Sequence, residues 1–324
     1  MASLPTFSFS STAEEVANAL SKEIAGKNVL ITGTSLNGIG FETARAIAIH
    51  APLVIITGYN EERLKLSEEA IKKDFPSANI RRLILDLSSF AAIRKAAAEV
   101  NAYPEPLHVL IHNAAAAIGD FKLTADGLES QMGTAHVGPF LLTKLLAPKL
   151  LSTSTARYTP RVVFVASIAQ FYSPGIKFDQ IAHPDAATYS GVSAYFDAKS
   201  ANVLTAIELS KRSKGAIKAY SLHPGVMHTN MSQKKESIPN LQAMGLLGPD
   251  GKPNTATMQW KSLAQGGATT VTAAFDPRIS DHPGSYLQDS VIANEAVAAP
   301  SSDPANAEKL WDVTEEIIGE NFTF

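Results

Sequence analysis

Short apolar runs alternate with helix-length segments along most of the 324-residue chain, and this alternation constrains the fold more than any other feature. The runs are bounded by Gly, Asn and Pro and are apolar on both faces, as strands buried beneath two layers of helices are. The sequence therefore predicts an α/β fold, with one doubly wound parallel sheet, right-handed crossovers and helices on both faces. The predicted strands are 28–33, 53–58, 81–87, 107–114, 161–167 and 217–225.

Two parts of the chain lie outside this alternation. Residues 1–25 form an N-terminal extension with a helix expected at 12–25, and residues 26–324 form a single domain, because no Pro/Gly/Ser-rich linker divides them. The segment at about 230–260 is rich in turn residues but also apolar. Its apolar residues are Leu241, Met244, Leu246 and Leu247. Because long irregular segments in compact domains are either disordered or functional, we interpret it as a substrate lid.

Composition excludes several functional classes. The 28 Lys and Arg residues are scattered among 31 Asp and Glu, so no basic block indicates a nucleic-acid partner. The absence of Cys excludes disulfides and thiolate chemistry, and the eight His residues show no metal-binding spacing, so we expect no metal. The N-terminus lacks the pattern of a signal peptide, and no run approaches about 18 apolar residues. We therefore expect a cytoplasmic protein without a transmembrane segment.

A polar set at the strand ends predicts proton chemistry, because open α/β sheets bind ligands at the carboxyl ends of their strands. Tyr195 and Lys199 lie four residues apart in a helical run and therefore share one helix face. An ammonium near a phenol favours the phenolate and lowers its pKa. Ser167, at the end of the fifth predicted strand, is placed to donate a hydrogen bond to the same substrate oxygen. Each residue alone is common by chance, and only the set is informative.

The stretch ITGTSLNGIG, residues 31–40, joins the first strand to a helix and has the pattern G-x-x-x-x-G-x-G. This spacing fits neither the dinucleotide fingerprint G-x-G-x-x-G nor the P-loop, which needs a Lys after its last glycine. Gly33 nevertheless ends the strand, and Gly38 and Gly40 open the helix, whose N-terminus favours an anion.

An ordered set of motifs identifies a known family. The motifs are TGTSLNGIG, LDLSS, LIHNAA, GPFLLTKLL, VVFVAS, AYFDAKSANVL, LHPGVMHTN and PGSYLQD followed by AEKLWDVTEEIIG. In this order they resemble the short-chain dehydrogenase/reductase superfamily, in its retinol-dehydrogenase-like branch, over roughly residues 25–320. The resemblance implies a Rossmann-like fold and an NAD(P)-dependent oxidoreductase that transfers hydride between a nicotinamide and a carbonyl or alcohol of an apolar small molecule. In the family's T-G-x-x-x-G-x-G motif, this chain has one additional residue, which we expect to face the adenosine ribose.

The resemblance also implies roles for individual residues. Tyr195 is the expected acid/base, Lys199 lowers its pKa and holds the nicotinamide ribose, and Ser167 orients the carbonyl. Asp86 is expected to contact the adenine, and Asn113 to stabilise the central strand. The expected cofactor-binding residues are Gly33, Ser35, Leu36, Asn37, Gly38, Ile39, Gly40, Tyr59, Arg63, Asp86, Leu87, Asn113, Ala114, Ala115, Tyr195, Lys199, Pro224, Gly225, Val226 and Thr229.

The chain departs from the family pattern at three positions. Ala135 stands where relatives carry an Asn that holds a proton-relay water, and His136 points to another side of the helix. Ala115 replaces a glycine beside the cofactor. Tyr59 stands where NADP-preferring relatives carry Arg, and no Asp follows the second strand to bind the ribose hydroxyls of NAD. We favour NADP(H) over NAD(H), with Ser35 and Arg63 near the 2′-phosphate.

Two other functions and the assembly state remain open at this point. The loss of the Asn at position 135 is compatible with a non-redox enzyme on the same fold, such as a dehydratase or isomerase. A regulatory protein that binds the cofactor without turnover is the third reading, and the intact Ser-Tyr-Lys set argues against it. Relatives are often dimers or tetramers built on the two long helices of the site, so a homo-oligomer is possible. The N-terminal helix and the lid are candidates to cover that face.

Overall fold

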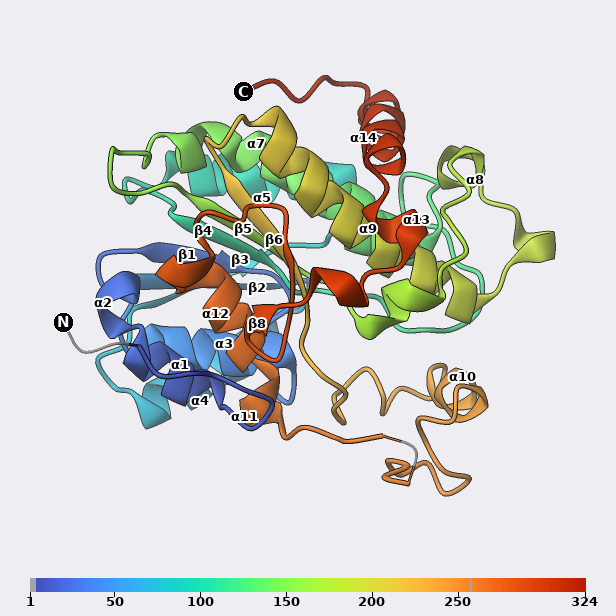
Figure 1. Cartoon of the computed structure of the whole chain (residues 1–324), viewed down its shortest axis with the longest axis horizontal. Helices are drawn as coiled ribbons and strands as arrows, with labels where there is room; N and C mark the ends of the chain where they lie inside the picture. The colour runs from blue at the N-terminus through green and yellow to red at the C-terminus, as the bar shows by residue number, and fades with distance from the viewer. Residues whose placement is uncertain (1–3, 257) are drawn as a thin grey trace.

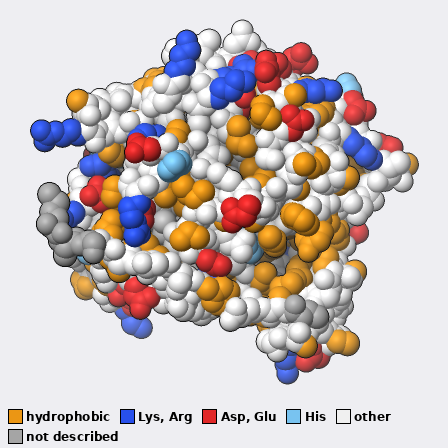
Figure 2. Space-filling view, viewed as in Figure 1, with side chains coloured by type: hydrophobic (Ala, Val, Ile, Leu, Met, Phe, Trp, Pro, Cys, Tyr) orange, Lys and Arg blue, Asp and Glu red, His pale blue; other side chains and the backbone are white. Residues whose placement is uncertain are grey.

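The computed structural model describes residues 4–256 and 258–324. Residues 1–3 of the expected N-terminal extension and residue 257 of the expected lid lie outside the described residues. Figure 1 shows one central sheet between two layers of helices. On the face drawn in Figure 2, Lys and Arg side chains are interspersed with Asp and Glu, in keeping with the scattered charges of the sequence.

The sheet has eight strands in the order β3-β2-β1-β4-β5-β6-β7-β8. Strand pairing is parallel from β3 through β7, and only β7 and β8 pair antiparallel. The predicted doubly wound parallel sheet is thus confirmed, whereas the final hairpin is an addition, because strands of three and two residues show no clear periodicity. The strands are β1 (Asn28–Ile31), β2 (Leu53–Gly58), β3 (Ile80–Ile84), β4 (Val109–His112), β5 (Arg161–Val165), β6 (Lys218–His223), β7 (Tyr286–Gln288) and β8 (Val291–Ile292).

Helices bury both faces of this sheet, as the apolar strands require (Figure 1). Leu30 of β1 faces one layer, whereas its neighbours Val29 and Ile31 face the other. The first layer contains α5 (Phe90–Ala102), α7 (Gly138–Leu151), α9 (Gly191–Arg212) and α14 (Pro304–Ile318), and the second contains α1 (Ala13–Ala19), α3 (Ile39–Ala48), α4 (Glu61–Asp74) and α12 (Ala268–Phe275). Short helices complete the chain: α2 (Ser21–Ile24), α6 (Ser130–Met132), α8 (Asp179–Ala182), α10 (Ile238–Ala243), α11 (Leu263–Gly266) and α13 (Ala299–Ser302).

Local sequence signals explain where the helices begin. The Asn60 side chain accepts a hydrogen bond of 2.9 Å from the backbone N–H of Arg63 and caps α4, as Asn commonly does at a helix N-terminus. Thr12 and Glu15 form a capping box at the start of α1, so the expected N-terminal helix is present, divided into α1 and α2.

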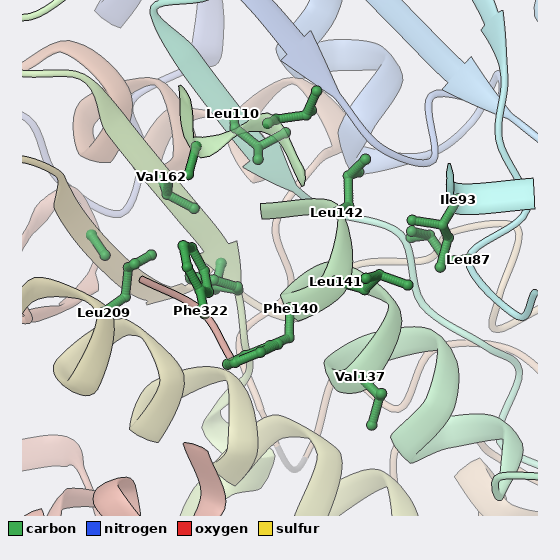
Figure 3. Packing of buried hydrophobic residues seen from close by; sticks show 14 of the residues in the cluster. Leu87, Ile93, Leu110, Val137, Phe140, Leu141, Leu142, Val162, Leu209 and Phe322 are labelled. Atoms are coloured by element: carbon green, nitrogen blue, oxygen red, sulfur yellow. The ribbon is translucent and has the colours of Figure 1, made fainter. Parts of the chain in front are cut away.

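The C-terminus, rather than the N-terminus, covers α7 and α9. Helix α14 packs along α9, and the ring of Phe322 stacks on Trp311 with centroids 5.1 Å apart. Phe322 also meets Phe140 of α7 edge-on at 5.6 Å (Figure 3). Helix α1 instead packs on α3 and α12, so the expectation that the N-terminal helix covers the α7 and α9 face is wrong. A homo-oligomer stays a prediction.

The two residues that flank the irregular segment 227–259 lie next to each other. Val226 and Trp260 form an isolated parallel bridge, so the two ends of the segment lie side by side. Between them the chain contains α10 and extends away from the sheet (Figure 1).

Candidate active site

A cavity of about 790 Å³ opens at the carboxyl ends of the parallel strands, where the sequence predicted a site. It is bounded by the β1–α3 turn, the loops after β4 to β6 and the 227–259 segment. The predicted residues that line it are Gly33, Ser35, Gly38, Ile39, Tyr59, Arg63, Asp86, Leu87, Asn113, Ala114, Ala115, Ser167, Tyr195, Lys199, Pro224, Gly225, Val226 and Thr229. Predictions from six separate strand ends therefore converge on a single cavity.

The β1–α3 turn contributes Gly33, Ser35, Gly38 and Ile39 to the cavity wall. Gly33 has φ +71°, and a Cβ there would lie 2.7 Å from the Cα of Ala114, so no side chain fits. Gly38 caps α3 without any side-chain hydrogen bond, and Gly38 and Ile39 both line the cavity. An uncapped helix N-terminus that faces a cavity suits the pyrophosphate of a dinucleotide.

Three of the predicted residues in this turn, Leu36, Asn37 and Gly40, do not line the cavity. Gly40 serves packing instead, because a Cβ there would lie 2.3 Å from the side-chain nitrogen of Asn113. The carbonyls of Leu36 and Asn37 accept hydrogen bonds from the side chain and the backbone of Asn230. The carbonyls of these two residues therefore face the 227–259 segment, whereas Ser35, in the same part of the turn, lines the cavity. Our expectation that the additional residue faces the adenosine ribose stays a prediction.

Polar groups mark the end of the cavity beside β2 and β3. Arg63 lines the cavity, and no carboxylate within residues 4–256 and 258–324 pairs with its guanidinium. The Tyr59 side chain is 65% exposed at the rim. Asp86 accepts hydrogen bonds from the backbone and the hydroxyl of Ser88 through one carboxylate oxygen, at 2.9 and 2.6 Å. These bonds hold its carboxylate at the tip of β3.

Ser167, Tyr195 and Lys199 all line the cavity. Tyr195 and Lys199 project from α9, and the Lys199 ammonium lies 5.6 Å from the centre of the Tyr195 ring. Lys199 is 3% exposed and donates a hydrogen bond of 2.8 Å to the carbonyl of Val165, which fixes the ammonium beside β5.

Burial controls the protonation of these groups. It raises the pKa of the Tyr195 hydroxyl above its ordinary value, and a hydrogen bond with Ser167 opposes this rise. Burial also lowers the pKa of the Lys199 ammonium to about 8. We expected Lys199 to lower the pKa of Tyr195, but in the structure desolvation has the largest effect on that pKa, and the opposing effect comes from Ser167. The tyrosine is therefore held as the neutral phenol, which is the form that donates a proton.

Position 135 lies in a π-helical turn, Gly133–Val137, that precedes α7. The side-chain amide of Asn202 donates a hydrogen bond of 2.6 Å to the carbonyl of Ala135. The His136 ring is buried and forms hydrogen bonds with the hydroxyls of Thr314 at 2.8 Å and Thr205 at 3.1 Å. It faces α9 and α14, and it does not line the cavity.

Comparison with known proteins agrees with this geometry. Residues 27–178 match the short chain dehydrogenase family. Over 315 residues the chain is 35% identical to the chloroplastic short-chain dehydrogenase TIC 32 A of Brassica napus, and the match covers 95% of this chain and 93% of that protein. The chain is a short-chain dehydrogenase/reductase.

Further relatives place this short-chain dehydrogenase/reductase in the retinol-dehydrogenase-like branch. It is 32% identical to retinol dehydrogenase 12 of Mus musculus over 298 residues, which cover 92% of this chain and 88% of that protein. The crystal structure of an uncharacterized protein from Mycobacterium paratuberculosis aligns with a TM-score of 0.68 and 27% identity, over 93% of this chain and 96% of that one. The protein is thus an oxidoreductase that acts on a CH–OH or C=O group, and its family binds a nicotinamide cofactor.

Apolar side chains close the cavity of this dehydrogenase on the side of the 227–259 segment. Leu241 and Leu247 are buried against Ile118 from the loop after β4, and Trp260 and the Tyr195 ring pack on this cluster. No helix within residues 4–256 and 258–324 is long and apolar enough to cross a membrane. In the same part of the chain, no three His, Cys, Asp or Glu side chains converge as a metal site.

Sequence reasoning missed several residues of the cavity wall. They include Thr32, Asn60, Ser88, Ala116, Ala117, Thr134, Tyr172, Phe196, Met258 and Trp260. The run of four alanines from Ala114 to Ala117 was the one available signal, because such small side chains after a strand leave room for a ligand. The others come from helices and loops whose direction only the fold determines. His223 ends β6 and also lines the cavity.

Proposed function

We propose that the protein is an NADP(H)-dependent reductase or dehydrogenase of an apolar carbonyl or alcohol, with Tyr195 as the acid/base. The observation that carries this proposal is that the hydroxyl-bearing pair Ser167 and Tyr195 lines the same cavity as apolar side chains such as Leu241 and Leu247. Such a pair presents two hydroxyls to one substrate oxygen.

The residues divide the chemical work in the following way. The bound nicotinamide supplies a hydride to the substrate carbon or accepts one from it. In the reducing direction, the Tyr195 hydroxyl donates its proton to the carbonyl oxygen, and the Ser167 hydroxyl donates a hydrogen bond to the same oxygen. The Lys199 ammonium stabilises the resulting phenolate and is positioned to hold a ribose hydroxyl. In the oxidising direction, the phenolate accepts the alcohol proton.

The cofactor is NADP(H) in this proposal. Arg63 is free of carboxylate partners within the described part of the chain, and it lies with Ser35 at the end of the cavity beside β2. A guanidinium is well suited to a 2′-phosphate, and the residue directly after β2 is Tyr59, not an Asp that would repel one. Gly38 and Ile39 are proposed to bind the pyrophosphate, Asp86 the adenine, and Pro224 to Val226 with Thr229 the nicotinamide.

The 227–259 segment is proposed to act as the substrate lid. Support comes from the cluster of Leu241, Leu247 and Ile118, which packs against the partly buried ring of Tyr195. An apolar wall opposite two hydroxyls favours a hydrophobic substrate that carries one oxygen function. The extension 1–25 is proposed to be structural. The expected cytoplasmic location stays a prediction.

The test is a titration of the protein with NADPH and NADH, followed by a panel of apolar aldehydes, ketones and alcohols monitored by nicotinamide absorbance. We expect tighter binding of NADPH and a change in absorbance with at least one substrate class. Conversion of a substrate without any change in nicotinamide absorbance favours the non-redox enzyme. We consider that alternative because Ala135 replaces the usual Asn. Tight binding without turnover of any panel member favours the regulatory protein.

A further inference from the structure

The Lys261 side chain lies buried directly behind the loop Pro224–Val226. None of the side chain is exposed, and its backbone N–H donates a hydrogen bond of 2.8 Å to the carbonyl of Val226. Gly225 has φ +98°, and a Cβ there would lie 2.5 Å from Cδ of Lys261. The loop backbone therefore rests on the methylene groups of Lys261.

The ammonium of Lys261 ends in an ion pair with the turn between β7 and β8. Its Nζ lies 2.6 Å from a carboxylate oxygen of Asp289 and 4.7 Å from the centre of the Phe9 ring, which belongs to the N-terminal extension. A buried ammonium is costly by several kcal/mol unless a carboxylate compensates it. Asp289 supplies that compensation, and Phe9 covers the other side.

Asp289 is itself held in a fixed position. It and Ser290 have φ of +51° and +66°, the geometry of a tight two-residue hairpin turn. The backbone N–H of Ser290 donates a hydrogen bond of 3.2 Å to the hydroxyl of Thr269 on α12. The ion pair therefore connects the loop Pro224–Val226 to the β7–β8 turn, and this turn is itself bonded to α12.

The third polar side chain at this place is His223, which ends β6 beside the hairpin. Burial lowers the pKa of the His223 imidazole to about 4, and the charges of Asp289 and Lys261 act on it in opposite directions. The ring is therefore uncharged at neutral pH. The Lys261 and Asp289 charges thus balance each other without a net contribution from His223.

We propose that the ion pair of Lys261 and Asp289 is a positioning device that holds the loop Pro224–Val226 against the nicotinamide half of the cofactor. Apolar residues in place of both Lys261 and Asp289 would avoid the cost of desolvating the charges, so stability alone does not account for an ion pair here. The pair instead fixes the position of the loop Pro224–Val226 relative to the β7–β8 turn. This inference rests on the proposed cofactor site.

The test compares two ligands that differ only by the nicotinamide half. NADPH and 2′,5′-ADP are titrated by calorimetry into the wild type and Lys261→Met, which keeps the apolar stem and removes the charge. If the wild type prefers NADH, then NADH and ADP are used. We expect about tenfold weaker binding of the complete cofactor and unchanged binding of the adenosine half. A purely structural role for the pair predicts that both ligands weaken together or that neither changes, and either result overturns the proposal.

Two further variants complete the design. Lys72→Met is the matched control, because Lys72 forms an ion pair of the same 2.6 Å length with Glu68 on the surface of α4, and it must leave both affinities unchanged. Asp289→Asn tests the same pair from the other side if Lys261→Met does not fold, since Asn also tolerates positive φ. Wild-type protein that binds neither ligand overturns the proposed function itself, a result distinct from equal binding by wild type and variant.

Discussion

The side-chain amide of Asn202 reaches the carbonyl oxygen of Ala135 at 2.6 Å, and both residues are buried. The amide that relatives carry at position 135 is absent, and another helix satisfies the backbone there. We expect Asn202→Leu to lower the free energy of unfolding by about 1–3 kcal/mol, because the carbonyl is left buried without a donor. Urea unfolding measures this change.

The control for Asn202 is Asn101→Leu, which removes a similar hydrogen bond of 3.0 Å to the carbonyl of Leu145 at an exposed site. We expect a change of no more than about 0.5 kcal/mol there. Equal effects of the two substitutions contradict the importance of the buried bond.

Tyr195→Phe removes the proposed acid/base and retains the ring that packs on Ile118, Leu241 and Leu247. We expect kcat to fall by about a hundredfold to ten-thousandfold, with the Kd of NADPH within about twofold of the wild type. Steady-state kinetics and a binding titration measure the two quantities. Tyr172→Phe is the control, because that hydroxyl belongs to a ring that is 62% exposed at the same cavity. Undiminished turnover by Tyr195→Phe refutes the assignment.

Arg63→Ala is expected to weaken NADPH binding by about tenfold to a hundredfold and to leave NADH binding nearly unchanged, because only NADPH carries the 2′-phosphate that the guanidinium is proposed to bind. The ratio of the two dissociation constants reports the effect. Lys65→Ala, which removes an exposed cation two residues further along α4, serves as the control. An equal loss for both cofactors excludes a phosphate-specific role.

Stability is expected to decrease on mild acidification because burial lowers the pKa of the His136 imidazole to about 3. The unfolded chain, with an ordinary pKa of about 6.5, binds a proton that the folded chain does not. This contribution to the free energy of unfolding is present above pH 6.5 and is lost as the pH falls toward 3. Each such histidine contributes a slope of up to about 1.4 kcal/mol per pH unit.

We therefore expect His136→Gln to reduce the slope of the free energy of unfolding against pH, between pH 6.5 and 4, by up to about 1.4 kcal/mol per pH unit. His183→Gln, at an exposed position, is expected to leave this slope unchanged. Urea unfolding at a series of pH values supplies the slopes. The same slope in wild type and His136→Gln contradicts the prediction.

The sheet and the strand-end residues were predictable from the sequence because parallel strands bring their carboxyl ends to one edge. Asp86, Asn113, Ser167 and Pro224 each follow an apolar run, so their approach needed no knowledge of side-chain packing. The short hairpin of β7 and β8 was not predictable, since so few residues carry no period.

Contacts between remote segments explain the remaining differences. Leu36 and Asn37 were assigned to the cofactor by their place in a motif, but their carbonyls bind Asn230, nearly two hundred residues along the chain. The approach of Lys261 to Asp289 and of Asn202 to Ala135 depends on how separate elements pack. Desolvation of Tyr195 likewise depends on the folded lid, so its raised pKa was not visible in the helix pattern.

The bridge between Val226 and Trp260 has a consequence for how enzymes of this kind diversify. Because the intervening segment begins and ends at neighbouring points, a loop of different length and composition can replace it without altering the path of the sheet. Ser167, Tyr195 and Lys199 all lie outside the 227–259 segment. If the segment is the substrate lid that we propose, evolution or a protein engineer can retarget the enzyme by exchanging the part of this loop beyond Asn230, while Ser167, Tyr195, Lys199 and Thr229 are retained.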